Sequence, residues 1–487
     1  MIPAAPPSAI LRDGLILLII ALVLRAASFG DPNVHIDEAF YLLVGQAMHH
    51  GAVPYVDIWD RKPLGLFAIY WAIAGISANV LAYQLIAALT AAATALVLAH
   101  IVRRWTGGLA PLMAGTAYLF YMHPLLGMGG QSPVFYNLLI AGAALLIMSG
   151  WAGTDATQFR RHYLAAMALC GLALTIKQTT LFEGVCFGLA GAFWLHRSGQ
   201  PLGKTARDAT AAVATALLPT ALIGAWYAAH GWWPQWFNAM VTSNFRRSGL
   251  GEPAVLHNIT AVAALLAVYV GVAAYGWAAQ RHAPGFKPYR MFVLGWMAAA
   301  LAGFLAVPNF FDHYALPLLV PLTVLASLAY ARPILGPVLL GVTALIAVIL
   351  GRPFDFAHQR ASAASFAEMA QVIERYRGQR SLLLLSGPVL LYPATHSPLP
   401  TALVFPGHLT NSVEVGVSYL NTRTELQRIA AARPSVIVMR SEIPPPVTDD
   451  PMQPLMDYIR ADCRAVWQGI AYETRASEVP VMILACR

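Results

Sequence analysis

The stretch His35-Ile-Asp-Glu-Ala-Phe-Tyr41, followed by Asp57-Ile-Trp-Asp-Arg-Lys-Pro63, concentrates acidic and basic side chains directly after the first hydrophobic segment. Only 11% of the 487 residues are charged. Because charge beside lipid is costly to bury, such a cluster predicts a functional site. The alternative interpretation is an ordinary hydrophilic loop between two membrane spans.

The composition decides the class of protein. Hydrophobic residues make up 58% of the chain, and the mean hydropathy is +0.59. Soluble domains are about half apolar and about a quarter charged, whereas many stretches here approach the ~20 apolar residues that cross a bilayer. The sequence therefore predicts a polytopic α-helical membrane protein. Its net charge of +8 is then a matter of loop topology, and no nucleic-acid partner is expected.

About eleven hydrophobic runs are expected to span the membrane, with the N-terminus inside and the C-terminus outside. This orientation gathers Lys and Arg in the inside loops, as the charge rule requires. The first run is interpreted as a retained span and not a cleaved signal. The expected spans lie near 14–29, 78–101, 109–124, 133–151, 163–177, 179–196, 208–229, 257–279, 291–307, 314–331 and 333–350.

The first external loop, about 30–78, is expected to hold two helices that lie at the membrane surface. The first covers residues 38–50, with Asp37 as its N-cap and Gly51 ending it. Its apolar face is expected to meet lipid, and its opposite face includes Glu38. The second covers 63–76, which is too short for a confident span and is expected to be an interfacial or re-entrant helix.

Residues 352–487 are more polar than residues 1–351, which form the transmembrane domain, and predict a small external α/β domain. Cys463 and Cys486 flank two strand-like runs and could pair in an oxidising compartment. Cys170 and Cys186 lie in predicted spans and are interpreted as buried apolar residues. The strands are expected at 381–385, 435–439, 465–471 and 479–485, and a short helix at 423–432.

The external loops separate acids from bases. The first loop carries the acids, whereas cationic and aromatic residues come from several turns. Lys and Arg bind phosphate through charge-assisted hydrogen bonds, and a carboxylate can take a proton as general base. The pattern therefore favours transfer of a group from an anionic lipid carrier. The candidate residues are Asp37, Glu38, Asp60 and His35 on the acid side, and Lys62, Lys177, Arg246, Arg247, His313 and Tyr314 on the phosphate side.

Each cationic residue also has a simpler interpretation. Lys177 could extend its ammonium group from a helix end toward water, and Arg246 and Arg247 could bind ordinary anionic headgroups. His313 could be a hydrogen-bonded interface histidine. The tryptophans before Arg246 are typical of a membrane-interface belt.

Together these residues resemble a known family. Asp37-Glu38 and the segment Gly51-Ala-Val-Pro-Tyr-Val-Asp-Ile-Trp-Asp-Arg-Lys-Pro63 resemble the first external loop of the GT-C glycosyltransferases. The closest likeness is to the bacterial branch grouped with protein O-mannosyltransferases and aminoarabinose transferases. Further resemblance lies in Lys177-Gln178, in Asn244, and in His313-Tyr314 followed by Pro317 and Pro321.

The resemblance covers about residues 10–330 and implies a GT-C fold, a polyprenyl-phosphate sugar donor and inverting transfer on the outer face of the membrane. It makes Asp37 the general base and places Lys62 on the donor phosphate. Some relatives use a divalent metal, for which His35, Glu38 and Asp60 could be ligands. Their spacing is not diagnostic, so no metal is assigned.

The leading hypothesis is a glycosyltransferase of the bacterial inner membrane whose active site and C-terminal domain face the periplasm. It would move a monosaccharide from a polyprenyl-phosphate donor to a lipid or glycan of the cell envelope. A protein hydroxyl is the alternative acceptor. Hypotheses of another class are a transporter or flippase for a lipid-linked sugar, which would call for paired repeats and charges at the midplane, and a non-catalytic lipid-binding scaffold.

Overall fold

The computed structural model describes residues 7–246, 249–378, 380–411, 413–442 and 450–487. The chain divides into two compact units, and neither is continuous in sequence. We call them the helical unit and the mixed unit. The helical unit comprises the residues up to Ala26 with Leu85–Ile223 and Leu250–Phe354, and the mixed unit comprises Ala27–Gln84, Gly224–Gly249 and Asp355–Arg487.

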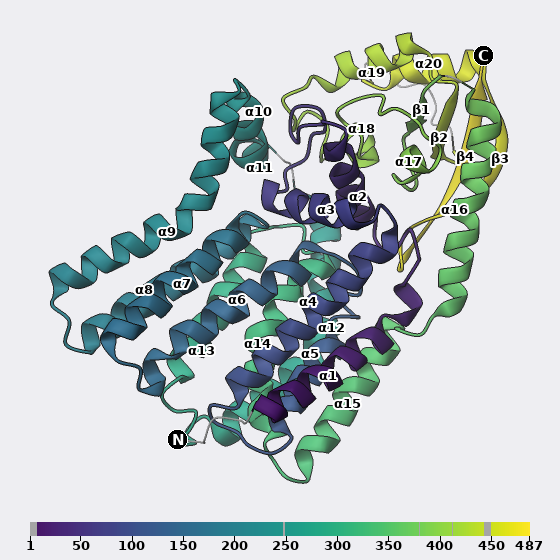
Figure 1. Ribbon diagram of the computed structural model, residues 1–487. Coiled ribbons are helices and arrows are strands. Elements are labelled where there is room, and N and C mark those ends of the chain that lie inside the picture. The colour runs from purple at the N-terminus through teal and green to yellow at the C-terminus, as the bar shows by residue number, and fades with distance from the viewer. Residues whose placement is uncertain (1–6, 247–248, 379, 412, 443–449) are drawn as a thin grey trace. The chain divides into compact units, whose positions relative to one another are not determined.

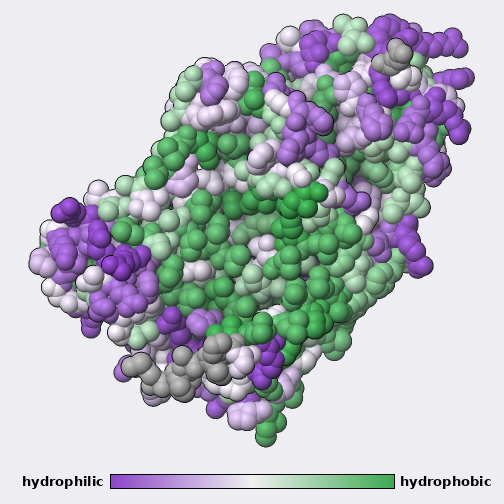
Figure 2. Space-filling model, in the orientation of Figure 1, coloured by the Kyte–Doolittle hydropathy of each residue, from purple (hydrophilic) through white to green (hydrophobic). Residues whose placement is uncertain are grey.

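The helical unit confirms the predicted class, because a helix is found at each of the eleven predicted span positions. Five helical stretches of the described chain are long and apolar enough to cross a membrane by length and composition, and others are shorter. Hydrophobic side chains cover these helices in Figure 2. The helices (Figure 1) are α1 (Pro7–Leu24), α4 (Val80–Val102), α5 (Ala110–Tyr121), α6 (Ser132–Met148), α7 (Ala156–Leu174), α8 (Leu181–Arg197), α9 (Leu202–Ala229), α12 (Glu252–Gln280), α13 (Arg290–Leu305), α14 (Leu319–Tyr330) and α15 (Leu335–Gly351).

The charged groups of α1 are paired inside this unit. Arg25, at the end of α1, is 1% exposed and donates hydrogen bonds to the carbonyl oxygens of Gly127 (2.8 Å) and Met128 (2.6 Å). Asp13 is equally buried and forms an ion pair with Arg103. Charged side chains occur within hydrophobic segments when ion pairs or hydrogen bonds compensate their burial. Arg25 and Asp13 therefore have a structural role.

The mixed unit contains a four-stranded sheet of order β1-β2-β4-β3, in which β1 and β2 are parallel and the other pairs antiparallel. The expected strands and the helix at 423–432 are all found. The strands are β1 (Leu382–Leu384), β2 (Val436–Arg440), β3 (Cys463–Thr474) and β4 (Ser477–Cys486), and the helices are α16 (Phe356–Arg377), α17 (Leu391–Ala394), α18 (Pro406–Thr410), α19 (Thr422–Ala432) and α20 (Gln453–Asp462). α16 runs beside β3 (Figure 1).

The core of the sheet includes a residue of the first external loop. Trp59 is fully buried among Leu383, Ile437 and Leu426, and its backbone N–H donates to the carbonyl oxygen of Ala402 (2.9 Å). Burying an aromatic side chain supplies a large apolar area. The first loop and the C-terminal region therefore share one hydrophobic core.

Cys463 and Cys486 form a disulfide across the ends of the β3–β4 hairpin, 23 residues apart in sequence. Closing a loop of this length stabilises a fold by about 3 kcal/mol in the chain-entropy model. We expect the double variant Cys463→Ala/Cys486→Ala to lower the unfolding midpoint of the detergent-solubilised protein by several degrees. Dithiothreitol should lower the midpoint of the wild type but not that of the variant. Cys186→Ala, which removes a free thiol, is the control and should respond to reductant as the wild type does.

The first-loop helices are α2 (Ile36–His49) and α3 (Leu64–Ile76), as predicted in position, but two details were wrong. The N-cap of α2 is His35, whose Nδ1 accepts a hydrogen bond from the Asp37 N–H at 3.2 Å, so Asp37 lies inside the first helical turn. The face with Glu38 is not open, since that side chain is 0% exposed. The expected end at Gly51 is found, with φ of +91°.

α2 packs closely against α3 at a glycine. A Cβ atom at Gly45 would lie 2.6 Å from the carbonyl carbon and oxygen of Tyr70. No side chain fits at that distance from backbone, so glycine is what lets the two helices approach. The α2 residues from Glu38 to Gly45 are buried on both faces of the helix, which explains why a two-faced surface helix was the wrong expectation.

Candidate functional site

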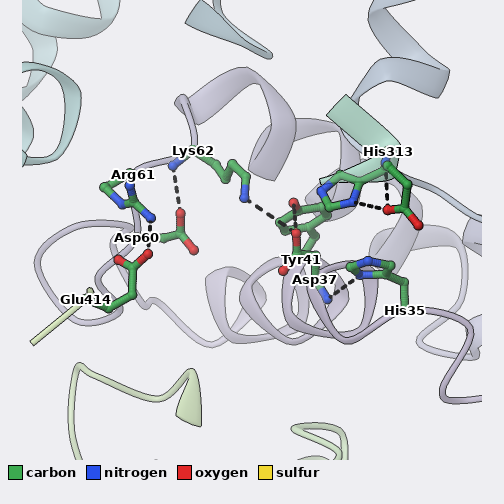
Figure 3. Close-up of polar contacts among 9 residues, drawn as sticks. His35, Asp37, Tyr41, Asp60, Arg61, Lys62, His313 and Glu414 are labelled. Carbon is green, nitrogen blue, oxygen red and sulfur yellow. Dashed lines mark hydrogen bonds and ion pairs between the residues drawn. The ribbon is translucent and has the colours of Figure 1, made fainter. Parts of the chain in front are cut away.

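Two side chains of the mixed unit, those of Lys62 and Tyr41, contact the Asp37 carboxylate (Figure 3). The Lys62 Nζ lies 3.7 Å from the Asp37 Oδ2. The Tyr41 hydroxyl donates to the same oxygen at 3.4 Å, and the Lys62 Nζ lies 5.3 Å from the centre of the Tyr41 ring. Asp37 and Lys62 are about one-fifth exposed, at 20% and 19%. Both distances exceed those of tight charged hydrogen bonds.

Local hydrogen bonds bring Lys62 to this position. The Asp60 Oδ1 accepts from the Lys62 backbone N–H at 2.8 Å. The Tyr55 hydroxyl donates to the Lys62 carbonyl oxygen at 2.8 Å. Asp and Asn side chains stabilise turns by such bonds two residues on. The Asp60 carboxylate thus shapes the turn that presents Lys62.

Tyr55 itself is held in an uncommon conformation. Its φ is +70°, a region that a bulky residue enters only when its surroundings compensate. Its N–H donates to the Ile58 carbonyl oxygen at 2.6 Å, and the Tyr227 hydroxyl donates to the Pro54 carbonyl oxygen at 3.1 Å. Burial raises the pKa of Tyr55, and Tyr227 and Asp60 add to the effect, so its phenol remains a donor. Sequence reasoning missed both tyrosines.

Arg61 faces the C-terminal region. Its Nη2 lies 2.6 Å from the Glu414 Oε1, and the two side chains are 19% and 8% exposed. This ion pair spans 353 positions in the sequence and lies beside the Asp60–Lys62 turn in Figure 3. Glu414 was not predicted as a site residue. Nothing in the sequence around a single acidic residue indicates an ion pair with a residue so far away in the chain.

His408 packs against Trp59 of the same loop. Its ring is 4.7 Å from that of Trp59 and 6.3 Å from that of Phe40. Burial lowers the pKa of His408 to about 4, with Arg61 and Lys62 adding to the effect and Asp60 and Asp37 opposing it. The imidazole is therefore neutral at neutral pH.

This neutral histidine predicts a pH dependence of stability. An unfolded histidine has a pKa near 6.5, so between pH 6.5 and about 4 the unfolded state binds more protons than the folded state. The free energy of unfolding is expected to fall as the pH drops through this window, by at most about 1.4 kcal/mol per pH unit. Replacing His408→Phe should reduce that slope in unfolding curves recorded from pH 7 to 4.5. An unchanged slope would show that other groups cause the acid sensitivity.

A second group of predicted residues meets within the helical unit. Lys177 precedes the 3₁₀ turn Gln178–Thr180, and His313 and Tyr314 lie in the 3₁₀ helix Asp312–Leu318. The Lys177 Nζ lies 4.9 Å from the centre of the Tyr314 ring. His313 contacts Asp312, with Nδ1 to Oδ1 at 3.4 Å, and its ring lies 4.6 Å from that of Tyr314.

The remaining predicted residues differ in burial. Arg246 is exposed at the end of α11 (Ser243–Arg246), which follows α10 (Trp233–Phe237) and a π-helical turn. Arg247 lies outside the described residues. Glu38 is fully buried, and His35 is 6% exposed.

The acids of the first loop do not fit a divalent metal site. The His35 Nδ1 and the Asp60 Oδ1 already accept backbone hydrogen bonds, and Glu38 is buried in the helix packing. In the described part of the chain, no group of three or more His, Cys, Asp or Glu side chains has an arrangement that could hold a metal ion.

A separate cleft of about 980 Å³ lies along the later part of α2. Its walls come from α2, α16 and the segment 390–399, and include Gln46, Phe366 and Tyr392. Gln46 follows Asp37 by nine residues, about two and a half helical turns, and so faces the opposite side of α2. The cleft is therefore separate from the Asp37 carboxylate and its contacts with Lys62 and Tyr41.

Comparisons with known proteins identify the fold. No family model and no curated protein sequence matches the chain. Among solved structures, the chain is similar to the crystal structure of ArnT from Cupriavidus metallidurans bound to undecaprenyl phosphate, with a TM-score of 0.64, 15% sequence identity, and 98% of each chain covered. At that identity the likeness establishes architecture. The chain therefore has the fold of the ArnT structure, a GT-C-like polytopic membrane fold, as the first-loop motif predicted.

Proposed function

We propose that the protein is an inverting glycosyltransferase that moves a monosaccharide from a polyprenyl-phosphate donor to a hydroxyl of a cell-envelope lipid or glycan. The observation that carries the proposal is the Asp37 carboxylate, partly exposed beside Lys62 in a chain of GT-C fold. The ArnT structure of the same fold contains undecaprenyl phosphate, which supports this class of donor.

In the proposed reaction, the acceptor oxygen attacks the anomeric carbon from the side opposite the phosphate. The bond between that carbon and the phosphate oxygen breaks, the configuration inverts, and polyprenyl phosphate leaves. Asp37 takes the acceptor's hydroxyl proton as general base. The positive charge of Lys62 stabilises the phosphate oxygen as negative charge develops on it.

The Tyr41 hydroxyl orients the base. It comes from one helical turn after Asp37 and donates to Oδ2, so the other carboxylate oxygen is directed to the acceptor. Lys177, Arg246, Arg247, His313 and Tyr314 are proposed as further contacts for the lipid carrier's phosphate. The Lys177–Tyr314 contact and the contact between the His313 and Tyr314 rings bring three of these residues together, which supports this role.

The proposed location is the bacterial inner membrane, with the mixed unit in the periplasm. Two observations support this side. The Cys463–Cys486 disulfide is typical of an oxidising compartment, and the topology predicted from the sequence places most Lys and Arg residues of the loops inside. A protein hydroxyl stays the alternative acceptor within the same reaction.

The test is a donor panel. Purified protein in lipid nanodiscs is incubated with undecaprenyl phosphates that carry different monosaccharides, and release of undecaprenyl phosphate is measured with and without an envelope lipid extract. Acceptor-dependent release from at least one donor is the expected result. Movement of intact donor between leaflets without any release would contradict the proposal and favour a flippase.

A further inference from the structure

The tip of the β3–β4 hairpin contacts the segment that leads into α2. Thr474, the last residue of β3, forms an isolated antiparallel bridge with His35. The next residue, Arg475, donates its backbone N–H to the Val34 carbonyl oxygen at 3.3 Å. The hairpin thus continues its backbone pairing onto the two residues that precede the first turn of α2.

The Arg475 side chain adds two hydrogen bonds to this contact. Its Nη1 donates to the Ser28 hydroxyl at 3.2 Å and its Nη2 to the Asp355 carbonyl oxygen at 3.1 Å. Ser28 is 0% exposed, and Asp355 is the N-cap of α16. Arg475 therefore contacts Ser28 and the N-cap of α16 through its guanidinium group. It contacts Val34 through its backbone.

The residues between Ser28 and His35 are held by further buried bonds. The Asp31 Oδ1 accepts from the Asn33 N–H at 3.0 Å and from the Ser362 hydroxyl at 2.7 Å. The Gln84 side chain donates to the Asp31 carbonyl oxygen at 2.8 Å. Asp31 and Asn33 are almost fully buried. Because these bonds are shielded from water, the segment has little freedom to shift.

The last link runs from His35 to Asp37. The His35 Nδ1 caps α2 by accepting a hydrogen bond from the Asp37 N–H, so the position of His35 sets where Asp37 lies in the first turn of the helix. A displacement of about 1 Å at a reacting group can cost about 10²-fold in rate. The contacts of Arg475 with Val34 and of Thr474 with His35 are therefore three and two residues, respectively, from the carboxylate whose placement matters most.

We propose that Arg475 is a positioning residue for Asp37, and that the C-terminal hairpin thereby forms part of the catalytic machinery. The proposal rests on the function proposed above, since it assumes that Asp37 is the base. It gives the C-terminal region a role in the rate of transfer, in addition to any role in binding the acceptor.

Two measurements test the proposal, with Arg475→Ala and Arg475→Lys compared against Arg464→Ala. Arg464 is an exposed arginine in the same strand, so it controls for charge and for general effects on the hairpin. In steady-state kinetics, Arg475→Ala is expected to lower kcat by about 10- to 100-fold with the donor KM unchanged. Arg475→Lys should restore part of the rate, and Arg464→Ala should match the wild type.

The second measurement is amide hydrogen exchange of the peptide that covers residues 34–43, which needs no activity. Arg475→Ala should increase exchange there, and Arg464→Ala should not. Unchanged kcat in an active Arg475→Ala protein would overturn the positioning role, as would unchanged exchange. A wild type inactive with every donor, but with exchange that still depends on Arg475, would instead overturn the proposed function and leave the structural link in place.

Discussion

Asp37→Asn is expected to lower kcat by about 10³-fold, within the range that general-base catalysis usually contributes. The amide keeps the size of the side chain and can still accept from the Tyr41 hydroxyl, but it cannot take up the acceptor's proton. Binding of undecaprenyl phosphate should persist, because the substitution leaves Lys62 in place and removes a negative charge beside it.

The control for this variant is Asp155→Asn. Asp155 caps α7 by accepting from the backbone N–H groups of Thr157 and Gln158, and Asn is an equally good N-cap. Turnover and donor binding are measured for both proteins. Near-normal turnover by Asp37→Asn would show that another group is the base.

Lys62→Ala is expected to raise the donor KM by about 10- to 100-fold, since hydrogen bonds to charged groups are worth about 1.5–3 kcal/mol. The value of kcat should also fall, because the developing negative charge on the phosphate loses its partner. The fall should be smaller when Lys62 is replaced by Arg, which retains the charge but binds with a different, planar geometry.

Lys287→Ala provides the matched control, because Lys287 is exposed in a loop of the helical unit. Initial rates are measured over a range of donor concentrations for all three variants and the wild type. An unaltered dependence of the rate of Lys62→Ala on donor concentration would contradict the assignment of Lys62 to the phosphate.

Hydropathy was sufficient to predict the helical architecture. A run of about twenty apolar residues has few alternatives to a membrane helix, so the positions of the spans follow from composition alone. Short alternating runs similarly predicted the strands, including the pair that Cys463 and Cys486 close. The first-loop motif added the fold family, which hydropathy could not distinguish.

The site could be predicted only in part, because its supports come from distant sequence. His35 is the cap of α2 although Asp37 was the better candidate by propensity. Glu38 is buried although a surface helix was expected. In each case the deciding contact is tertiary: Thr474 pairs with His35, and α3 packs at Gly45. Such contacts leave no local pattern, so Glu414, His408 and Arg475 could not be found from sequence.

The mixed unit is assembled from three segments of the chain, and the last of them begins at Asp355. A ribosome therefore completes every membrane helix before it makes the hairpin that meets His35. Bonds between positions as distant as Ser28 and Arg475, 447 residues apart, form late because closing such long loops is slow and costly. During synthesis, the proposed base Asp37 therefore lacks the contacts that the C-terminal hairpin makes with Val34 and His35. Biogenesis thus couples the onset of activity to delivery of the complete C-terminus, and truncated chains are expected to be inactive in the membrane.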